Sequence, residues 1–253
     1  MAGGAFSALN KGRPGAYINF ETRIESGLNI GTRGIATMAL PLKYGAENNL
    51  IEVSAQEFYN GDTLSKIGLM PQDADALLID LALRNCSIIK LYNTNKTAVK
   101  ATKTLTGGLV ITAKYGGTFG NKIAILIKSS GSKFDVETYA NGYHVDTQKV
   151  SGISDLVDND YVTFSGTGLI QATESTLLED GTDGTAMQAT EYLDKYFELL
   201  RVNKFDVLAA QNSESSEISK VVAFIEELRE KEGKYVQAVV ANYTTANYEG
   251  IIN

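Results

Sequence analysis

The sequence predicts an α/β protein whose parallel sheet is interrupted by an inserted antiparallel β-sandwich or barrel. Two patterns lead to this fold class. Residues 101–184 read as a series of short strands without a single proline. After residue 185, helical and strand patterns alternate, which is typical of parallel strands joined by right-handed crossovers. The strand predicted over 87–92 follows a helical pattern as well, so we expect it to belong to the same sheet.

The changes of pattern divide the 253 residues into four parts. A chain of this length can bury a core in each of two domains. The last predicted strand comes close to Asn253, so we expect a sheet whose C-terminal part is missing from this chain. The four parts are an extended N-terminal arm over 1–33, an N-terminal α/β part over 34–100, the inserted β domain over 101–184 and the start of a further α/β part over 185–253.

The arm over residues 1–33 is rich in glycine and shows little periodicity. A Pro-Gly pair at positions 14 and 15 marks a turn, and Tyr17, Ile18 and Phe20 then favour a short extended segment. Such an arm has few ways to bury its apolar side chains alone. Two interpretations remain: disorder in the isolated chain, or ordering on a neighbouring copy.

The part over 34–100 predicts two strands and two helices. Residues 35–41 are apolar enough for a buried strand, and residues 87–92 read as another. Ser54 and Glu57 fit a capping box, which predicts a short helix after Ser54. Residues 73–84 show helical spacing, which predicts a helix with one buried face. That buried face is expected to consist of Ala74, Leu77, Leu78 and Leu81.

The inserted domain is predicted from its strand patterns and turns. The dipeptide Asn141-Gly142 separates two strand patterns and is the strongest two-residue hairpin signal. The expected strands cover 109–114, 123–128, 134–140, 143–149 and 161–164.

The last part alternates helix, strand, helix and strand. Residues 205–210 and 235–241 are the expected strands, and a long amphipathic helix over 214–231 lies between them. The first helix has a stripe formed by Ala189, Leu193, Tyr196, Phe197 and Leu200, and the second has one formed by Ile218, Val221, Val222, Ile225 and Leu228.

Charge is distributed unevenly along the chain. The net charge of −7 argues against a general nucleic-acid binder. Residues 81–134 contain no acid and carry +9, whereas residues 145–185 carry −7. These segments either place lysines at strand edges and aspartates in loops, or give one subunit a basic surface that meets an acidic surface of the next.

The residue types needed for most catalysis are missing. The chain has one histidine, His144, and one cysteine, Cys86. A Ser-His-Asp triad would have to use His144, which lies just beyond a hairpin turn, and one histidine with one cysteine cannot form an ordinary zinc site. We expect His144 to be an exposed or half-buried hairpin residue and Cys86 a buried, inert thiol. The sequence therefore predicts a protein that is not an enzyme and that needs no metal or cofactor.

Two glycine-containing loops partly match known ligand-binding motifs, one for phosphate and one for calcium. Residues 116–122 lack the Gly-Lys-Ser/Thr ending of a phosphate loop and lead into a strand, so we expect a turn. Residues 179–184 match only a fragment of a calcium loop and lack its bidentate glutamate, so we expect a solvated interdomain turn. No stretch is long and apolar enough to cross a membrane, and the N-terminus lacks a signal-peptide pattern.

Several segments together resemble the contractile tail sheath proteins of bacteriophages and the related R-type bacteriocins. They occur in the order found in that family and spread over nearly the whole chain. The segments are Arg13–Phe20, Arg33–Ala36 with Leu40–Leu42 and Tyr44-Gly45, Ala113–Asn121, and Gly181–Gly184.

The resemblance implies a structural subunit that polymerises as helically stacked hexameric rings around a tail tube and contracts to drive the tube through a cell envelope. It implies a subtilisin-like α/β domain without a protease site, interrupted by the inserted β domain, and a C-terminal domain that this chain lacks. Tyr17, Ile18 and Phe20 would form an inter-subunit arm that adds strands to neighbouring sheets. Gly181, Asp183 and Gly184 would form an interdomain hinge.

The resemblance also implies the partners and the location. The expected partners are further copies of the chain, the tail tube protein, and the baseplate and tail terminator proteins, with no nucleic acid and no membrane insertion. The subunit would assemble in the bacterial cytoplasm and leave in a phage tail or bacteriocin particle on host lysis.

One alternative belongs to a different functional class. An α/β enzyme or ligand-binding protein with a β insertion could work with carboxylates and lysines alone. It would need a deep pocket at the carboxyl ends of the parallel strands, near Ala210 and Ala241.

Overall fold

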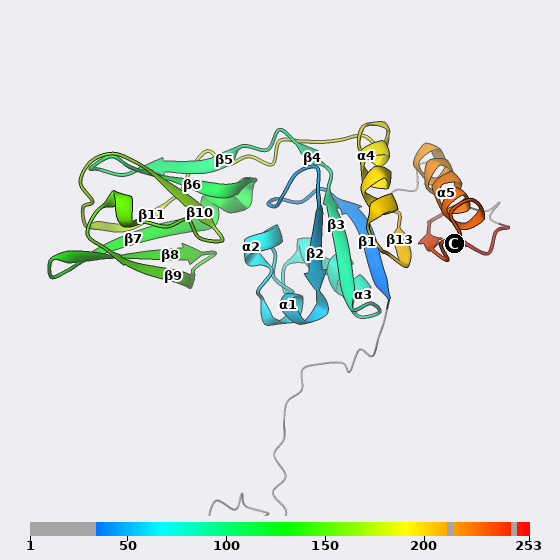
Figure 1. Ribbon diagram of the computed structural model, residues 1–253, viewed down its shortest axis with the longest axis horizontal. Helices are drawn as coiled ribbons and strands as arrows, with labels where there is room; N and C mark the ends of the chain where they lie inside the picture. The colour runs from blue at the N-terminus through cyan, green and yellow to red at the C-terminus, as the bar shows by residue number, and fades with distance from the viewer. Residues whose placement is uncertain (1–33, 212–214, 244–246) are drawn as a thin grey trace, which may run out of the picture.

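The protein consists of a β-sandwich beside an α/β domain, as Figure 1 shows. This structure, a computed structural model, describes residues 34–211, 215–243 and 247–253. From Gly34 the described chain runs through the α/β domain, crosses to the sandwich and returns, so the sandwich is an insertion. The predicted combination of an α/β sheet with an antiparallel insertion is confirmed.

The α/β domain is built on one six-stranded sheet in the order β15-β14-β13-β1-β3-β2. All neighbouring pairs are parallel except β2 and β3, which are antiparallel. Strands from both ends of the chain meet at β1, which pairs with β3 on one side and β13 on the other. The strands are β1 (Ile35–Leu40), β2 (Leu50–Ser54), β3 (Ile88–Asn93), β13 (Val207–Ala209), β14 (Gln237–Val239) and β15 (Ile251–Ile252).

The sheet is larger than the sequence predicted. The strands expected over 87–92, 205–210 and 235–241 are β3, β13 and β14, and the strand expected over 35–41 becomes the central β1. Two strands, β2 and β15, were not predicted. A strand of two residues such as β15 is too short to show any period, and β2 continues directly into a helix whose cap dominates the local pattern.

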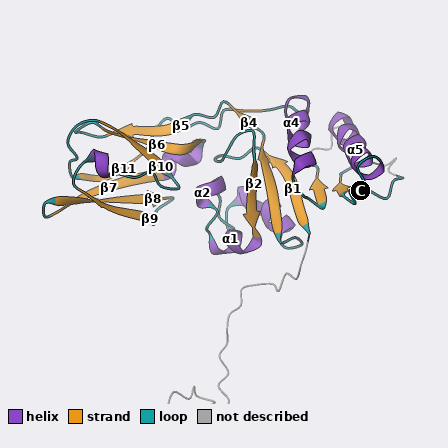
Figure 2. Cartoon of the chain, viewed as in Figure 1, coloured by secondary structure: helices purple, strands orange, loops and turns teal. Residues whose placement is uncertain are grey.

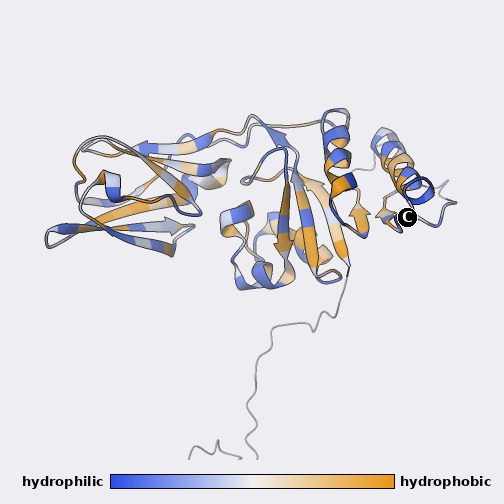
Figure 3. Cartoon of the chain, in the orientation of Figure 1, coloured by the Kyte–Doolittle hydropathy of each residue, from blue (hydrophilic) through white to orange (hydrophobic). Residues whose placement is uncertain are grey.

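Helices cover the sheet on both faces (Figure 2). On one face lie α1 (Ala55–Asn60), α2 (Leu64–Ile67) and α3 (Leu77–Leu83), and on the other lie α4 (Ala189–Val202) and α5 (Ser215–Glu230). Residues along β1 alternate between the two cores, since Met38 and Leu40 belong to one and Ala39 to the other. Burial on both faces explains why the β1 sequence is apolar except for Thr37, and Figure 3 shows the hydrophobic colour of the sheet.

The predicted buried face of α3 is wrong. Leu77, Leu78 and Leu81 are 58%, 41% and 46% exposed, whereas Ile79 and Leu83 are fully buried. Residues 74–76 form a 3-10 turn, so the α-helix begins only at Leu77 and buries a different apolar stripe. Both stripes of this short helix are apolar, and periodicity alone cannot choose between them.

The inserted domain is a sandwich of two separate antiparallel sheets. One sheet has the order β10-β6-β5 and the other β11-β7-β8-β9. Five of these strands were predicted, while β5 and β11 are short, largely polar and were missed. The strands are β5 (Lys100–Thr104), β6 (Leu109–Gly116), β7 (Ile123–Ser130), β8 (Lys133–Ala140), β9 (Tyr143–Val150), β10 (Val162–Gly166) and β11 (Thr173–Leu177).

The hairpin between β8 and β9 forms where the sequence predicted it. Asn141 and Gly142 adopt φ angles of 50° and 83°. Positive φ at both positions is what a two-residue type I′ turn requires, and asparagine and glycine tolerate it best. The capping box before α1 is also confirmed, because Ser54 and Glu57 bond reciprocally.

Candidate functional sites at the domain junction

The two connections between the domains run side by side. On leaving the α/β domain the chain forms β4 (Asn95–Lys96), and on returning it forms β12 (Thr185–Ala186), which pairs antiparallel with β4. Isolated bridges continue this pairing from Val99 to Thr182 and from Thr102 to Glu179. We call residues 95–102 and 179–186 together the connecting ribbon; it runs above the gap between the ribbons of the two domains in Figure 1. A paired ribbon restrains the sandwich more than two independent linkers would.

Two of the predicted hinge residues bond to the sandwich. The Gly181 N–H donates to Asn121 Oδ1 over 2.8 Å, and Asn121 Nδ2 donates back to the Gly181 carbonyl over 2.9 Å. The Thr118 N–H donates to Asp183 Oδ1 over 2.6 Å. All three hydrogen bonds join the returning connection to the 3-10 helix Thr118–Lys122, so this helix holds the connection in place.

Gly184, the third predicted hinge residue, lies where only glycine fits. Its φ is 69°, and a Cβ added there would lie 2.1 Å from the Lys96 carbonyl oxygen. The two connections can therefore approach this closely only because residue 184 has no side chain.

Tyr44 joins the two domains by burial. It comes from the loop after β1 but is fully buried in the sandwich core, with its ring centroid 5.0 Å from that of Phe119 and 5.3 Å from that of Tyr115. Its hydroxyl donates to the Tyr161 carbonyl over 3.2 Å. Burial raises the pKa of the Tyr44 hydroxyl well above its usual value. Sequence reasoning did not assign Tyr44 this role, since nothing in a lone loop aromatic shows which core it enters.

The glycine-rich stretch over 116–122 serves the same junction. It forms the 3-10 helix Thr118–Lys122 and leads directly into β7, as expected for a turn. The Phe119 N–H donates to the Lys43 carbonyl over 3.2 Å. A Cβ on Gly117 would lie 1.9 Å from that same oxygen, so close backbone approach explains this glycine.

The residues predicted to form the inter-subunit arm, Tyr17, Ile18 and Phe20, lie outside the described residues. The described chain begins at Gly34, whose carbonyl accepts a hydrogen bond of 3.2 Å from the Ser87 N–H. The arm therefore connects to the first residue of β1, at the centre of the α/β sheet.

The two residues with catalytic potential, His144 and Cys86, lie in different domains. His144 is exposed on β9 in the sandwich, with its Nε2 2.7 Å from Thr147 Oγ1. Cys86 is buried in the core of the α/β domain, and burial raises the pKa of its thiol. Both predicted environments are confirmed. Within the described part of the chain, no cluster of three or more His, Cys, Asp or Glu side chains could hold a metal ion.

The basic and acidic segments pair partly within the chain. Lys103 lies 2.7 Å from Glu179, and Lys114 lies 3.3 Å from Asp160. Each ion pair joins a lysine of the basic segment to a carboxylate of the acidic segment within the sandwich domain. The opposite charges of the two segments therefore partly neutralise each other. Lys100, Lys122 and Lys133 form no ion pair among the described residues and stay exposed, so they remain available to a neighbouring surface.

A cavity of about 540 Å³ opens on the sandwich, lined by residues of β6, β9, β10 and the loop between the last two. Its carboxylates already have partners. Asp146 accepts from Asn159 Nδ2 over 3.0 Å, and Asp158 accepts from the Phe164 N–H over 2.8 Å. The cavity lies in the sandwich and not near Ala210 or Ala241, where a ligand-binding α/β protein would be expected to have its pocket. Among the described residues, no helix is long and apolar enough to span a membrane.

Comparison with known proteins identifies the sandwich. Residues 96–183 match the family described as the phage tail sheath protein beta-sandwich domain. A sandwich of this family, inserted into an α/β domain, is what the described residues form. The sandwich is therefore similar to the β-sandwich domain of phage tail sheath proteins.

Solved structures extend the similarity beyond the sandwich. The crystal structure of a sheath tail protein from Desulfitobacterium hafniense is 35% identical, with a TM-score of 0.76 over 94% of this chain and 55% of that chain. A sheath tail protein from Listeria innocua is 33% identical, with a TM-score of 0.77 over 88% of this chain and 50% of that one.

Two curated proteins of Bacillus subtilis strain 168 match the whole chain. The phage-like element PBSX protein XkdK is 32% identical and the uncharacterized protein YqbK 33%, each over 276 residues. The chain spans 58% of the length of these two relatives. The resemblance to tail sheath proteins, drawn from four sequence segments, is confirmed, and the chain corresponds to part of their length.

Proposed function

We propose that the chain is a structural subunit of a contractile tail sheath, which polymerises as helically stacked hexameric rings around a tail tube and contracts to drive the tube through a cell envelope. The observation that carries this proposal is the tail-sheath sandwich over residues 96–183 in a chain that resembles solved sheath tail proteins over 94% of its length. The proposed partners are other copies, the tail tube, and the baseplate and tail terminator proteins. Assembly would take place in the bacterial cytoplasm, with release on lysis in a phage tail or R-type bacteriocin.

A subunit that transmits force needs domains that move together. The connecting ribbon and the burial of Tyr44 in the sandwich core support such a unit. Stacked rings require contacts between different faces of neighbouring copies, and contraction requires that those contacts have two stable arrangements.

We assign the arm and the hinge as proposals within this function. Tyr17, Ile18 and Phe20 would link neighbouring copies, as the resemblance to tail sheath proteins implies. Gly181, Asp183 and Gly184 would set the position of the sandwich. Rotation of residues 181–183 away from the 3-10 helix Thr118–Lys122 would break the Asn121–Gly181 and Thr118–Asp183 hydrogen bonds, which favour the present position.

The α/β domain is proposed to be the subtilisin-like domain implied by the family resemblance, with its C-terminal part outside this chain. A parallel sheet with helices on both faces supports this assignment. The single histidine lies on β9 of the sandwich, so the α/β domain described here has no imidazole for proteolysis.

Deletion of the arm tests the proposal. Protein expressed from the full reading frame, with and without residues 1–22, is examined by negative-stain electron microscopy. The intact protein should form hollow ribbed tubes, and the deletion should abolish them while leaving the thermal unfolding midpoint unchanged. Tubes of normal length and number after the deletion would contradict the role of the arm.

A further inference from the structure

Among the residues that the structure describes, β3 is the only strand that pairs with β2, so β2 forms one edge of the six-stranded sheet. In an antiparallel pair, the N–H and C=O groups of every second residue point away from the partner strand. Such an edge is a ready acceptor for a strand from another chain. In a protein that links copies by adding strands, an open β2 edge would compete with the correct one.

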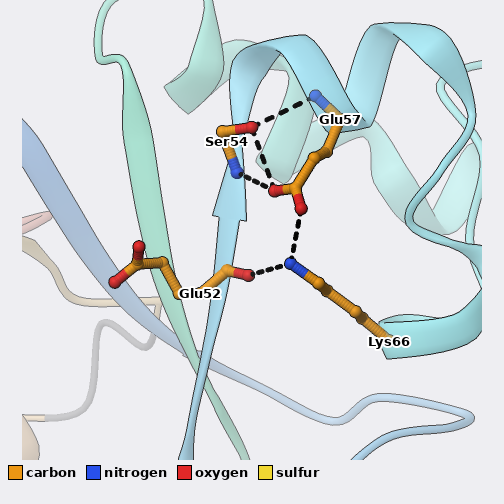
Figure 4. A network of polar contacts seen from close by, with 4 residues as sticks. All are labelled: Glu52, Ser54, Glu57 and Lys66. Carbon is orange, nitrogen blue, oxygen red and sulfur yellow. Dashed lines mark hydrogen bonds and ion pairs between the residues drawn. The ribbon is translucent and has the colours of Figure 1, made fainter.

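Three of the outward groups of β2 are bonded to local side chains. The Glu52 carbonyl accepts from Lys66 Nζ over 3.0 Å, and the Ser54 N–H donates to Glu57 Oε2 over 2.9 Å. The Leu50 N–H, on the same side, donates to Asn49 Oδ1 over 2.9 Å. Figure 4 shows Lys66 and Glu57 beside the strand, with their contacts to Glu52 and Ser54. An incoming strand would have to displace all three side-chain bonds.

Lys66 and Glu57 also hold each other in place. Lys66 Nζ lies 2.7 Å from Glu57 Oε1, while the other carboxylate oxygen of Glu57 bonds to Ser54. The hydrogen bond from Lys66 lowers the pKa of Glu57, which keeps this carboxylate charged and accepting. Lys66 belongs to α2 and Glu57 to α1, so two different helices deliver the two groups to one strand edge.

A second edge is closed in a similar way. β10 ends the three-stranded sheet of the sandwich, and its Phe164 N–H donates to Asp158 Oδ1 over 2.8 Å. The Val162 carbonyl of the same strand accepts from the Asn159 N–H over 3.1 Å. Side-chain closure of exposed edges therefore recurs in both domains.

We propose that Lys66 and Glu57 form an edge guard, which denies the outer edge of β2 to strands from other copies and so restricts where the arm of a neighbour can be added. This inference rests on the proposed function only in its assumption that copies link by strand addition. The edge guard makes Lys66 and Glu57 residues that determine the specificity of assembly without touching the added strand.

The substitution Lys66→Met tests the edge guard, with Lys195→Met as its matched control. Lys195 also forms an exposed ion pair, with Glu198 on α4, but it bonds to no strand. Both variants lose one charge. Sedimentation velocity on the isolated chain should show Lys66→Met self-associating at least tenfold more tightly than the wild type, and Lys195→Met unchanged. Equal behaviour of the two variants would overturn the proposal.

A second substitution, which should reverse the self-association of Lys66→Met, distinguishes strand addition from nonspecific hydrophobic association. Glu52→Pro in the Lys66→Met background removes the outward N–H at the centre of β2 and places a ring on the edge, which edge strands tolerate. We expect self-association to return to the wild-type level. Self-association that persists in the double variant would show that the β2 edge is not its cause.

Hydrogen exchange gives a second readout, which is measured on the wild-type chain as well as on a variant. The Ser54 amide should exchange at least tenfold more slowly than in Glu57→Ala, and fast exchange in the wild type would overturn the proposal. All these measurements use the chain without a tail tube. Absence of sheath tubes would therefore contradict the proposed function while leaving the edge guard intact, and an ineffective edge guard would leave the sheath assignment intact.

Discussion

Gly184 and Tyr44 join the domains by opposite means, one by lacking a side chain and the other by burying a large one. Residue 184 approaches the Lys96 carbonyl closely because the two connections between the domains pair with each other. No local sequence pattern shows this pairing. The sequence could indicate a glycine-rich turn over 181–184, but not that residues 118 and 121 would bond to it. Contacts between residues about 60 positions apart depend on the whole fold.

The substitution Gly184→Ala should destabilise the protein more than Gly131→Ala does. Both glycines have φ near 70°, at 69° and 68°, but a Cβ on Gly131 would meet no atom within 4 Å. Gly131→Ala should cost about 1 kcal/mol from backbone strain alone. Gly184→Ala should cost at least about 2 kcal/mol, because the clash with Lys96 is added. Urea unfolding measures both values, and equal costs would show that the ribbon relaxes around the new side chain.

Three buried tyrosines should make stability fall at high pH. Burial raises the pKa of Tyr44, Tyr192 and Tyr196 in the folded state. Their stabilising effect is complete below the unfolded-state pKa of about 10 and is lost as the pH rises above it, because the unfolded chain then releases protons that the folded chain retains. Each tyrosine contributes a slope of about −1.4 kcal/mol per pH unit.

Urea unfolding between about pH 9 and pH 11 measures this slope. Tyr192→Phe should remove one tyrosine's share of it. Tyr235→Phe is the control, since Tyr235 is 91% exposed. A slope unaffected by Tyr192→Phe would contradict the assigned role of burial.

At the scale of elements, the sequence predicted those features that depend only on neighbouring residues. The capping box before α1 and the Asn-Gly hairpin between β8 and β9 depend on neighbouring residues only, and both formed as predicted. The orientation of α3 depends on which of its two apolar stripes packs against the sheet. The strands β5 and β11 are held by their partners and carry little apolar alternation, so neither could be predicted from its own residues.

Substitutions on α3 test its orientation. Ile79→Ala should cost about 2 to 5 kcal/mol, because it leaves a cavity in a core where Ile79 is fully buried. Leu81→Ala on the 46% exposed side should cost less than about 1 kcal/mol. Chemical denaturation of the isolated chain provides both values. The reverse order would restore the stripe of Leu77, Leu78 and Leu81 as the buried face.

At the scale of the whole molecule, the alternation of patterns predicted an inserted β domain, but the strand order could not be predicted. β1 lies in the middle of the sheet because it pairs with β3 and with β13, a strand more than 160 residues later. Pairing at this distance leaves no local trace in sequence. The functional assignment came from four segments that resemble one family, while the arm over 1–33 stays a prediction outside the described residues.

The measurement that tests the central claim most directly is electron cryomicroscopy of the protein expressed from its full reading frame together with a tail tube protein. The account predicts hollow helical tubes whose cross-section has sixfold symmetry and in which each subunit shows the inserted sandwich joined to the α/β domain by the connecting ribbon. Subunits that remain monomeric at high concentration, or that bind no tube, would contradict it.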